Sequence, residues 1–138
     1  MLLLMLCLAG CGAKPAIVNA PACDARGDSA CLEIVRDGVV FYRRIDGLPT
    51  LTIDDGGIER TVVPLASVLQ PDLPPPLDDW HLKIIAVDGF SHGGFADWTN
   101  IEHGYLEVGT RRVVFTADQY LPDTFRVHDA YRMELTRQ

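Results

Sequence analysis

The sequence lacks several features by which large classes of protein are recognised. It has four cysteines and none after Cys31, so the rest of the chain holds no cysteine-rich metal site or disulfide framework. Basic residues are scarce, with 12 Lys and Arg against 19 Asp and Glu and a net charge of −7. Nucleic-acid binding requires a basic surface, so a nucleic-acid partner is excluded, as is broad attraction to anionic lipid. No internal repeat or low-complexity tract is present.

Long apolar runs are also missing, and the run at Met1–Leu8 is too short to span a bilayer as a helix. It leads into Leu8-Ala9-Gly10-Cys11, which resembles the lipobox of bacterial lipoproteins. The resemblance implies a signal peptide at residues 1–10 that is cleaved off, and diacylglycerol on the Cys11 thiol. The chain departs from the family in one respect, because no Lys or Arg precedes Lys14.

The lipobox implies a cellular location as well as a lipid anchor. Gly12 follows the lipidated cysteine where a retention signal would have Asp, which implies the outer membrane of the cell envelope. The protein is then extracytoplasmic and contacts the membrane through its lipid. The alternative is a buried N-terminal helix or strand of a soluble protein, which Gly10, Gly12 and Pro15 disfavour because they stop regular structure at the cleavage point.

The remaining chain divides into a tether and one domain. Residues 11–22 are small and contain Pro15 and Pro21, as a linker does, and residues 23–138 suit a single globular domain. Cys23 and Cys31 are close in sequence, and in an oxidising compartment they predict a disulfide worth about 2.5 kcal/mol in the chain-entropy model. A metal pair is the rival interpretation, but the spacing is not C-x-x-C and no His lies nearby.

Alternating apolar residues and turn signals predict a β-rich α+β domain of about six short, mostly antiparallel strands with one or two short helices. The segments read as strands are 39–42, 50–53, 58–63, 81–87, 111–116, 124–127 and 131–136, with short helices at 64–69 and about 96–102, a stiff extended connection at 71–76 and a loop at 118–123. Asp54-Asp55-Gly56-Gly57 predicts a hairpin in which Ile53 faces Ile58 and Thr52 faces Glu59. We interpret its acidic residues as turn formers and not as calcium ligands, because an EF-hand needs further oxygen ligands.

The motif that points most directly to chemistry is Gly89-Phe90-Ser91-His92-Gly93, directly after a predicted strand. It matches the G-x-S-x-G turn that exposes a nucleophilic serine in α/β-hydrolases. Asp118 or Asp123, and then His128, follow in the order of that family's triad. Several parallel βαβ units are needed for that fold, however, and too few residues follow Ser91. A simple turn at a strand end is the competing interpretation.

Other candidate groups carry weaker signals. His81, His92 and His103 recur at regular intervals among acidic residues, but their spacing matches no metal motif, so no metal or cofactor ligands are predicted. Arg26-Gly27-Asp28 lies within the predicted disulfide loop and resembles integrin-binding loops. The central aromatic residues either line a ligand groove or pack in the core, and they are Trp80, Phe90, Phe95 and Trp98.

The order of elements resembles the molybdopterin-binding domain of the sulfite oxidase family over residues 50–136. A hairpin leads to a short helix at Pro64–Leu69, then to a strand ending in Asp88-Gly89-Phe90, and a terminal strand lies at Tyr131–Thr136. The family's molybdenum-ligating cysteine has no counterpart, and no basic pocket for the pterin phosphate is evident. The resemblance therefore implies an α+β architecture, in a reduced form without the cofactor.

Together these observations favour a membrane-anchored lipoprotein whose domain binds a ligand or serves the envelope without catalysis. Two alternatives remain: a small serine esterase that uses Ser91, Asp123 and His128, and a reduced molybdopterin-type or metal-carrying domain. The sequence does not identify the small-molecule ligand or protein partner.

Overall fold

The computed structural model describes residues 23–116 and 121–137. The predicted signal peptide, the lipid-attachment residue Cys11 and the tether lie outside the described residues, as does Asp118. Among the described residues, none of the helices is long and apolar enough to cross a membrane.

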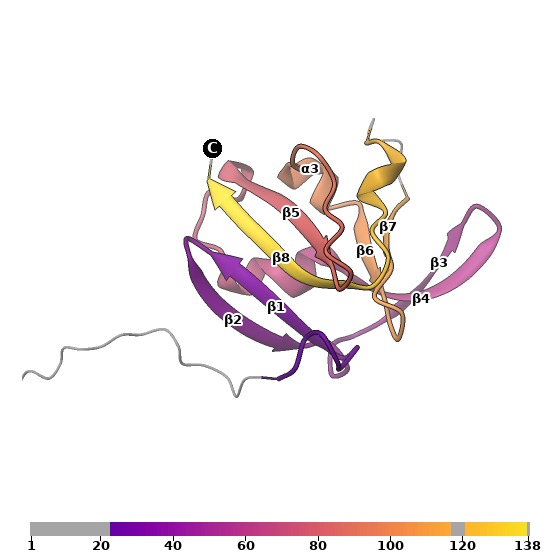
Figure 1. Cartoon of the computed structure of the whole chain (residues 1–138). Helices are drawn as coiled ribbons and strands as arrows, with labels where there is room; N and C mark the ends of the chain where they lie inside the picture. Colours follow the sequence, from indigo (N-terminus) through magenta and orange to yellow (C-terminus); the bar gives the residue numbers. More distant parts are fainter. Residues whose placement is uncertain (1–22, 117–120, 138) are drawn as a thin grey trace, which may run out of the picture.

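The described residues form eight strands in two four-stranded sheets (Figure 1). The first sheet has the order β2-β1-β8-β5, with β1 at Cys31–Arg36, β2 at Val39–Arg44, β5 at Trp80–Ala86 and β8 at Ala130–Arg137. The second has the order β3-β4-β6-β7, with β3 at Leu51–Asp55, β4 at Ile58–Pro64, β6 at Gly104–Glu107 and β7 at Val113–Phe115. Strands β1 and β8 are parallel and the other strand pairs are antiparallel. The predicted β-rich, mostly antiparallel single domain is thus confirmed.

Short helices connect the strands. Helix α2 (Leu65–Leu69) follows β4 directly, with Pro64 as its extended N-cap residue, and it buries Leu65, Val68 and Leu69. Helix α3 (Trp98–Ile101) begins with a reciprocal capping box between Asp97 and Asn100. The described residues also contain three 3₁₀ turns: η3 (Gln70–Asp72), η4 (Leu77–Asp79) and η5 (Asp123–Phe125). Both predicted α-helices are present, but the chain at Pro71 is a 3₁₀ turn and not the extended segment predicted there.

A single main core joins the two sheets. The inward side of β5 buries Leu82 and Ile84, as its alternation predicts, and Met133 and Leu135 of β8 lie beside them. Leu106 of the second sheet belongs to the same core. Because burial of apolar side chains is the dominant favourable term in folding, this shared core holds the two sheets together.

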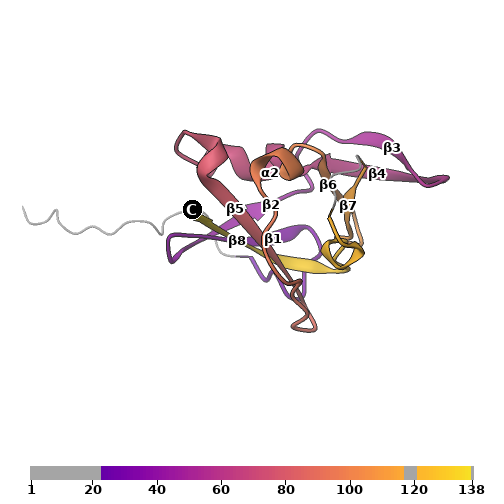
Figure 2. The same cartoon turned by 90° about the horizontal axis from the view of Figure 1, so that it is seen from above.

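The β3–β4 hairpin projects from the body of the molecule, as Figures 1 and 2 show from two sides. Its register differs from the prediction, because Asp55 pairs with Ile58 and Ile53 pairs with Arg60. Gly56 and Gly57, both at positive φ, form a two-residue loop by themselves. The two preceding aspartates are the last residues of β3, which shifts the pairing by two residues. Asp54 still stabilises the turn, because its Oδ1 accepts from the amide of Gly57 at 2.7 Å.

Two other element predictions need correction, and two strands were missed. The segment 124–127 is not a strand, since η5 occupies Asp123–Phe125 and the chain continues without regular structure to β8. Strands β1 and β6 were not predicted. The predicted strand at 111–116 is shorter, because Arg111 has a φ of 54° and β7 begins at Val113.

Candidate functional site

A pocket of about 360 Å³ lies between the end of β5 and the segment around η5. It is the candidate functional site because it contains Asp123 and His128, two of the three residues named for the alternative esterase, beside the exposed Phe90. Its complete lining consists of Ala86, Asp88, Phe90, Asp123, Thr124, Arg126 and His128. The pocket therefore combines an apolar side chain, two carboxylates and a guanidinium.

One wall of the pocket is a tight turn after β5. The amide of Ala86 donates to the carbonyl of Phe90 at 2.9 Å, and Gly89 at a φ of 92° allows the reversal. Asp88 Oδ1 accepts from the amide of Phe90 at 2.9 Å, the Asx-type contact that aspartate commonly makes in turns. The turn leaves the Phe90 side chain 45% exposed.

The opposite wall is the segment from η5 to His128. Phe125 is buried and stacks on the His92 ring, with ring centroids 3.9 Å apart. The carbonyl of Val127 accepts from the amide of Val113 at 2.8 Å, which fixes the segment against β7. With Phe125 and Val127 buried, the intervening Arg126 and the terminal His128 border the pocket.

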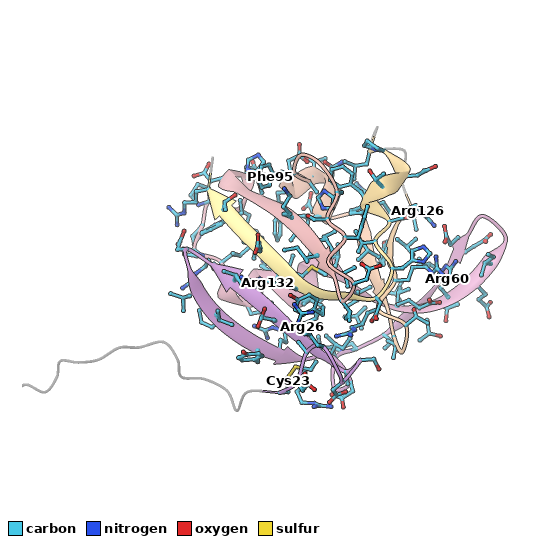
Figure 3. All side chains as sticks on the ribbon, in the orientation of Figure 1. Cys23, Arg26, Arg60, Phe95, Arg126 and Arg132 are labelled. Atoms are coloured by element: carbon cyan, nitrogen blue, oxygen red, sulfur yellow. A yellow bond between two sulfur atoms is a disulfide. The ribbon has the colours of Figure 1, made fainter. Side chains whose placement is uncertain are left out.

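A network of ion pairs extends from the pocket to the β3–β4 hairpin. Asp55 accepts from Arg126 at 2.5 Å and from Arg60 at 2.8 Å, and Arg60 also pairs with Glu107 at 3.1 Å. Figure 3 labels Arg60 and Arg126, which reach this network from β4 and from the segment after η5. Burial alone would raise the pKa of Asp55, but the hydrogen bonds from Arg126 and Arg60 outweigh it and lower that pKa. Asp55 is therefore a firmly charged carboxylate that orients Arg126.

His128 is held by a second arginine. Arg112 Nη1 lies 2.6 Å from His128 Nε2, and because a guanidinium can only donate, Nε2 is the acceptor in this contact. An imidazole nitrogen that accepts from arginine is not available to take a proton from a serine. The geometry gives His128 a polar binding role more readily than that of a general base.

The structure brings Asp123 and His128 to one pocket but places Ser91 outside its lining. Ser91 lies on the strand-like return that follows the turn, where it forms a β-bridge with Ile85. Farther along the same return, Ala96 and Leu82 exchange two backbone hydrogen bonds. The G-x-S-x-G residues thus begin an antiparallel ribbon, whereas a nucleophile elbow leads into a helix.

The three regularly spaced histidines lie in different environments. His92 is buried, and its Nε2 accepts from the amide of Ile84 at 3.0 Å. His103 is exposed after α3, and His81 Nδ1 lies 3.3 Å from the carbonyl of Asp79. In the described ranges, 23–116 and 121–137, no group of three or more His, Cys, Asp or Glu side chains could hold a metal ion. Of the four aromatic residues singled out in the sequence, Trp80 and Trp98 are buried and Phe90 and Phe95 are exposed.

The predicted disulfide between Cys23 and Cys31 is present, with Cα atoms 6.0 Å apart. Both charged residues of Arg26-Gly27-Asp28 make internal contacts. Arg26 Nη2 donates to the Tyr131 hydroxyl at 2.8 Å, and Asp28 Oδ2 pairs with Arg44 at 2.9 Å. The tripeptide is therefore part of the packing of this loop on the first sheet.

A buried arginine that the sequence did not single out secures the disulfide loop. Arg111 is 2% exposed, and its Nη1 donates to the carbonyls of Ala25 and Cys31. Its Nη2 pairs with Asp129 Oδ1 at 3.0 Å. Arg111 and Arg112 are adjacent in sequence, and nothing local indicates that the first is buried and the second faces the pocket network.

Comparison of this chain with protein-family models, curated proteins and solved structures gave no match. The resemblance to the sulfite oxidase family stays a prediction, as does the lipobox.

Proposed function

We propose that this chain is a lipid-anchored extracytoplasmic protein of the bacterial envelope, located at the outer membrane, whose domain binds a small ligand without catalysis. The lipobox at Cys11 supports the anchor. The Cys23–Cys31 disulfide supports the compartment, because disulfides persist outside the reducing cytoplasm.

The observation that carries the binding role is the composition of the pocket. An aromatic side chain that is 45% exposed at a pocket is free to stack on a ligand, while Asp88 and Asp123 can hold a cationic group. Arg126, oriented by Asp55, offers a guanidinium for an anionic group. The pocket therefore suits a small ligand that carries both charges together with an apolar part, and its volume falls within the range of small-molecule sites.

The anchor is tested by expressing the full chain in a bacterium with the lipoprotein-processing enzymes and measuring intact mass. We expect a chain that begins at Cys11 and carries diacylglycerol. The Cys11→Ala variant should remain unprocessed. If the wild-type chain is also unmodified, the protein has no lipid anchor and this part of the proposal is wrong.

Ligand binding is tested by native and denaturing mass measurement of the purified, folded protein. We expect an added mass under native conditions that is lost on denaturation and reduced in Phe90→Ala. Phe95→Ala is the matched control, because Phe95 is 44% exposed but does not line the pocket. We expect no fluorophosphonate labelling at Ser91, and labelling abolished by Ser91→Ala would establish the esterase alternative instead.

A further inference from the structure

The turn that carries Phe90 touches the disulfide loop at the start of the domain. Arg26 Nη1 donates to the carbonyl of Val87 at 3.2 Å, and Val87 packs in the same small apolar cluster as Cys23 and Tyr131. Figure 3 shows Cys23 and Arg26 together at the lower side of the molecule. The turn Val87–Phe90 thus has the disulfide loop on one side and the pocket on the other.

The position of Cys23 limits how far this turn can lie from the membrane. In the proposed function, residues 11–22 join the lipid on Cys11 to Cys23. A segment of that length spans at most about 40 Å when fully extended. Because the disulfide fixes Cys23 to β1, the span begins at the body of the domain. The turn and the pocket rim that it forms therefore lie at the end of the domain where the tether joins, within reach of the bilayer.

Phospholipid is the ligand whose chemistry fits a pocket at that end. A phosphoethanolamine headgroup carries an ammonium and a phosphate directly above an apolar layer. The carboxylates of Asp88 and Asp123 complement the ammonium, and the Arg126 guanidinium complements the phosphate. Phe90 is exposed at the same pocket, and aromatic side chains are favoured at the membrane interface.

We propose that the pocket binds the headgroup of a zwitterionic phospholipid in the anchoring membrane, with Phe90 inserted among the acyl chains. This inference rests on the proposed function, since it requires the lipid anchor, and it names the ligand of the same pocket. The domain then lies on the bilayer in one orientation and does not move freely on its tether.

The exposed carboxylates at this end of the domain disfavour contact with anionic lipid. Asp24 and Asp88 are exposed at the disulfide loop and the turn, and the whole chain carries a net charge of −7. Anionic lipid would be repelled by these carboxylates at the close approach that insertion of Phe90 requires. A headgroup that brings its own ammonium offsets them.

Phe95 provides a matched control for the position of Phe90. The two phenylalanines are 44% and 45% exposed. Figure 3 shows Phe95 on the upper side of the molecule, opposite Cys23, where Lys83 Nζ lies 5.3 Å from the ring centroid. The wild-type tryptophans, Trp80 and Trp98, are buried and contribute the same background emission to both variants.

The test uses the full, lipidated chain reconstituted in vesicles of phosphatidylethanolamine and phosphatidylcholine with brominated acyl chains. Fluorescence is compared for the Phe90→Trp and Phe95→Trp variants after circular dichroism has shown that both are folded. We expect bromine to quench the tryptophan introduced by Phe90→Trp and its emission to shift to shorter wavelength. The emission of the Phe95→Trp variant should be the same in brominated and in unbrominated vesicles. In phosphatidylglycerol vesicles the quenching of Phe90→Trp should be weaker.

The outcomes separate this inference from the function on which it rests. If the lipidated protein floats with the vesicles and Phe90→Trp is not quenched, the membrane orientation is wrong while the anchored protein stands. Equal quenching in phosphatidylethanolamine and phosphatidylglycerol overturns the headgroup assignment. If the chain carries no lipid and does not float, both the inference and the anchor fail.

Discussion

At the scale of single residues, His92 couples the stability of the domain to pH. Its Nε2 accepts from the amide of Ile84 at 3.0 Å, and its Nδ1 lies 3.3 Å from the carbonyl of Gly93. This arrangement requires the neutral ring, with the proton on Nδ1. Burial lowers the pKa of His92, and the charge of Lys83 lowers it further against the opposing Gly93 contact.

The sign of the pH effect follows from that depressed pKa. Above the ordinary histidine pKa of 6.5, the ring is neutral in the folded and the unfolded chain. As the pH falls below 6.5, the unfolded chain takes up a proton that folded His92 resists. The free energy of unfolding therefore decreases by up to about 1.4 kcal/mol per pH unit until the folded pKa is passed. Urea unfolding between neutral pH and mildly acidic pH measures this slope.

Two variants identify the group responsible for the slope. His92→Gln should be less stable at neutral pH but should lose most of the slope. His103→Gln is the control, because His103 is exposed, and it should keep the wild-type slope. The pKa values of Asp55 and Glu107 are lowered, so protonation of these carboxylates affects the stability only at a more acidic pH. An unchanged slope in His92→Gln would contradict the assignment.

Arg111 is the second residue whose removal should have a large effect. Its guanidinium donates to the carbonyls of Ala25 and Cys31 and pairs with Asp129, all from a buried position. We expect Arg111→Met to cost about 3 kcal/mol of unfolding free energy, because two buried carbonyls lose their donor. Arg112→Met, at a side chain 32% exposed, should cost less than about 1 kcal/mol. Chemical denaturation of both variants measures the difference, and equal losses would contradict it.

At the scale of elements, the close contact of α2, β6 and β7 depends on a glycine. A Cβ added to Gly104 would lie 2.6 Å from Leu65 Cδ1 and 2.8 Å from Phe115 Cε1. We expect Gly104→Ala to destabilise by about 1–3 kcal/mol through overpacking. Gly47→Ala is the matched control, since nothing lies within 4 Å of its added Cβ and it should be nearly neutral. Thermal unfolding compares the stability of the two variants. If Gly104→Ala does not change the stability, helix α2 must move easily to accept the added methyl group.

Elements whose pattern depended only on local chemistry were predictable from the sequence. The alternation in β5 and β8 and the proline at the start of α2 each indicated the correct element. Strand β1 was missed because both its partners, β2 and β8, determine its pairing, and β8 lies at the other end of the chain. The segment at 124–127 was predicted to be a strand, but its buried residues Phe125 and Val127 belong to a 3₁₀ turn and to an irregular segment.

The site was predictable only in part, for the same reason. The turn residues Asp88 and Gly89 are recognisable in the sequence, and Asp123 and His128 were named for a different role. Nothing in the sequence places Arg126 against Asp55, because a contact between a hairpin and a distant loop is a property of the whole fold. Charged residues separated widely in sequence carry no periodic signal of their partners.

At the scale of the whole molecule, the start of the domain is the part that tension on the proposed lipid tether would reach first. The Cys23–Cys31 disulfide and the Arg111 contacts both secure this segment. Cys31 is the first residue of β1, an interior strand of the first sheet between β2 and β8. A force applied at Cys23 therefore passes to the centre of a sheet and not to an edge.

Removal of the disulfide should weaken this end more than the rest of the domain. In the chain-entropy model, closing a loop with a sequence separation of 8 contributes about 2.5 kcal/mol. We expect the variant with Cys23→Ala and Cys31→Ala to lose about that much unfolding free energy. Reductant should lower the stability of wild type to a similar value and leave the double variant unchanged. Hydrogen exchange should increase in residues 24–30 before it increases in β5 and β8, because those strands belong to the main core. Uniform exchange across both regions would instead mean that the disulfide supports the core directly.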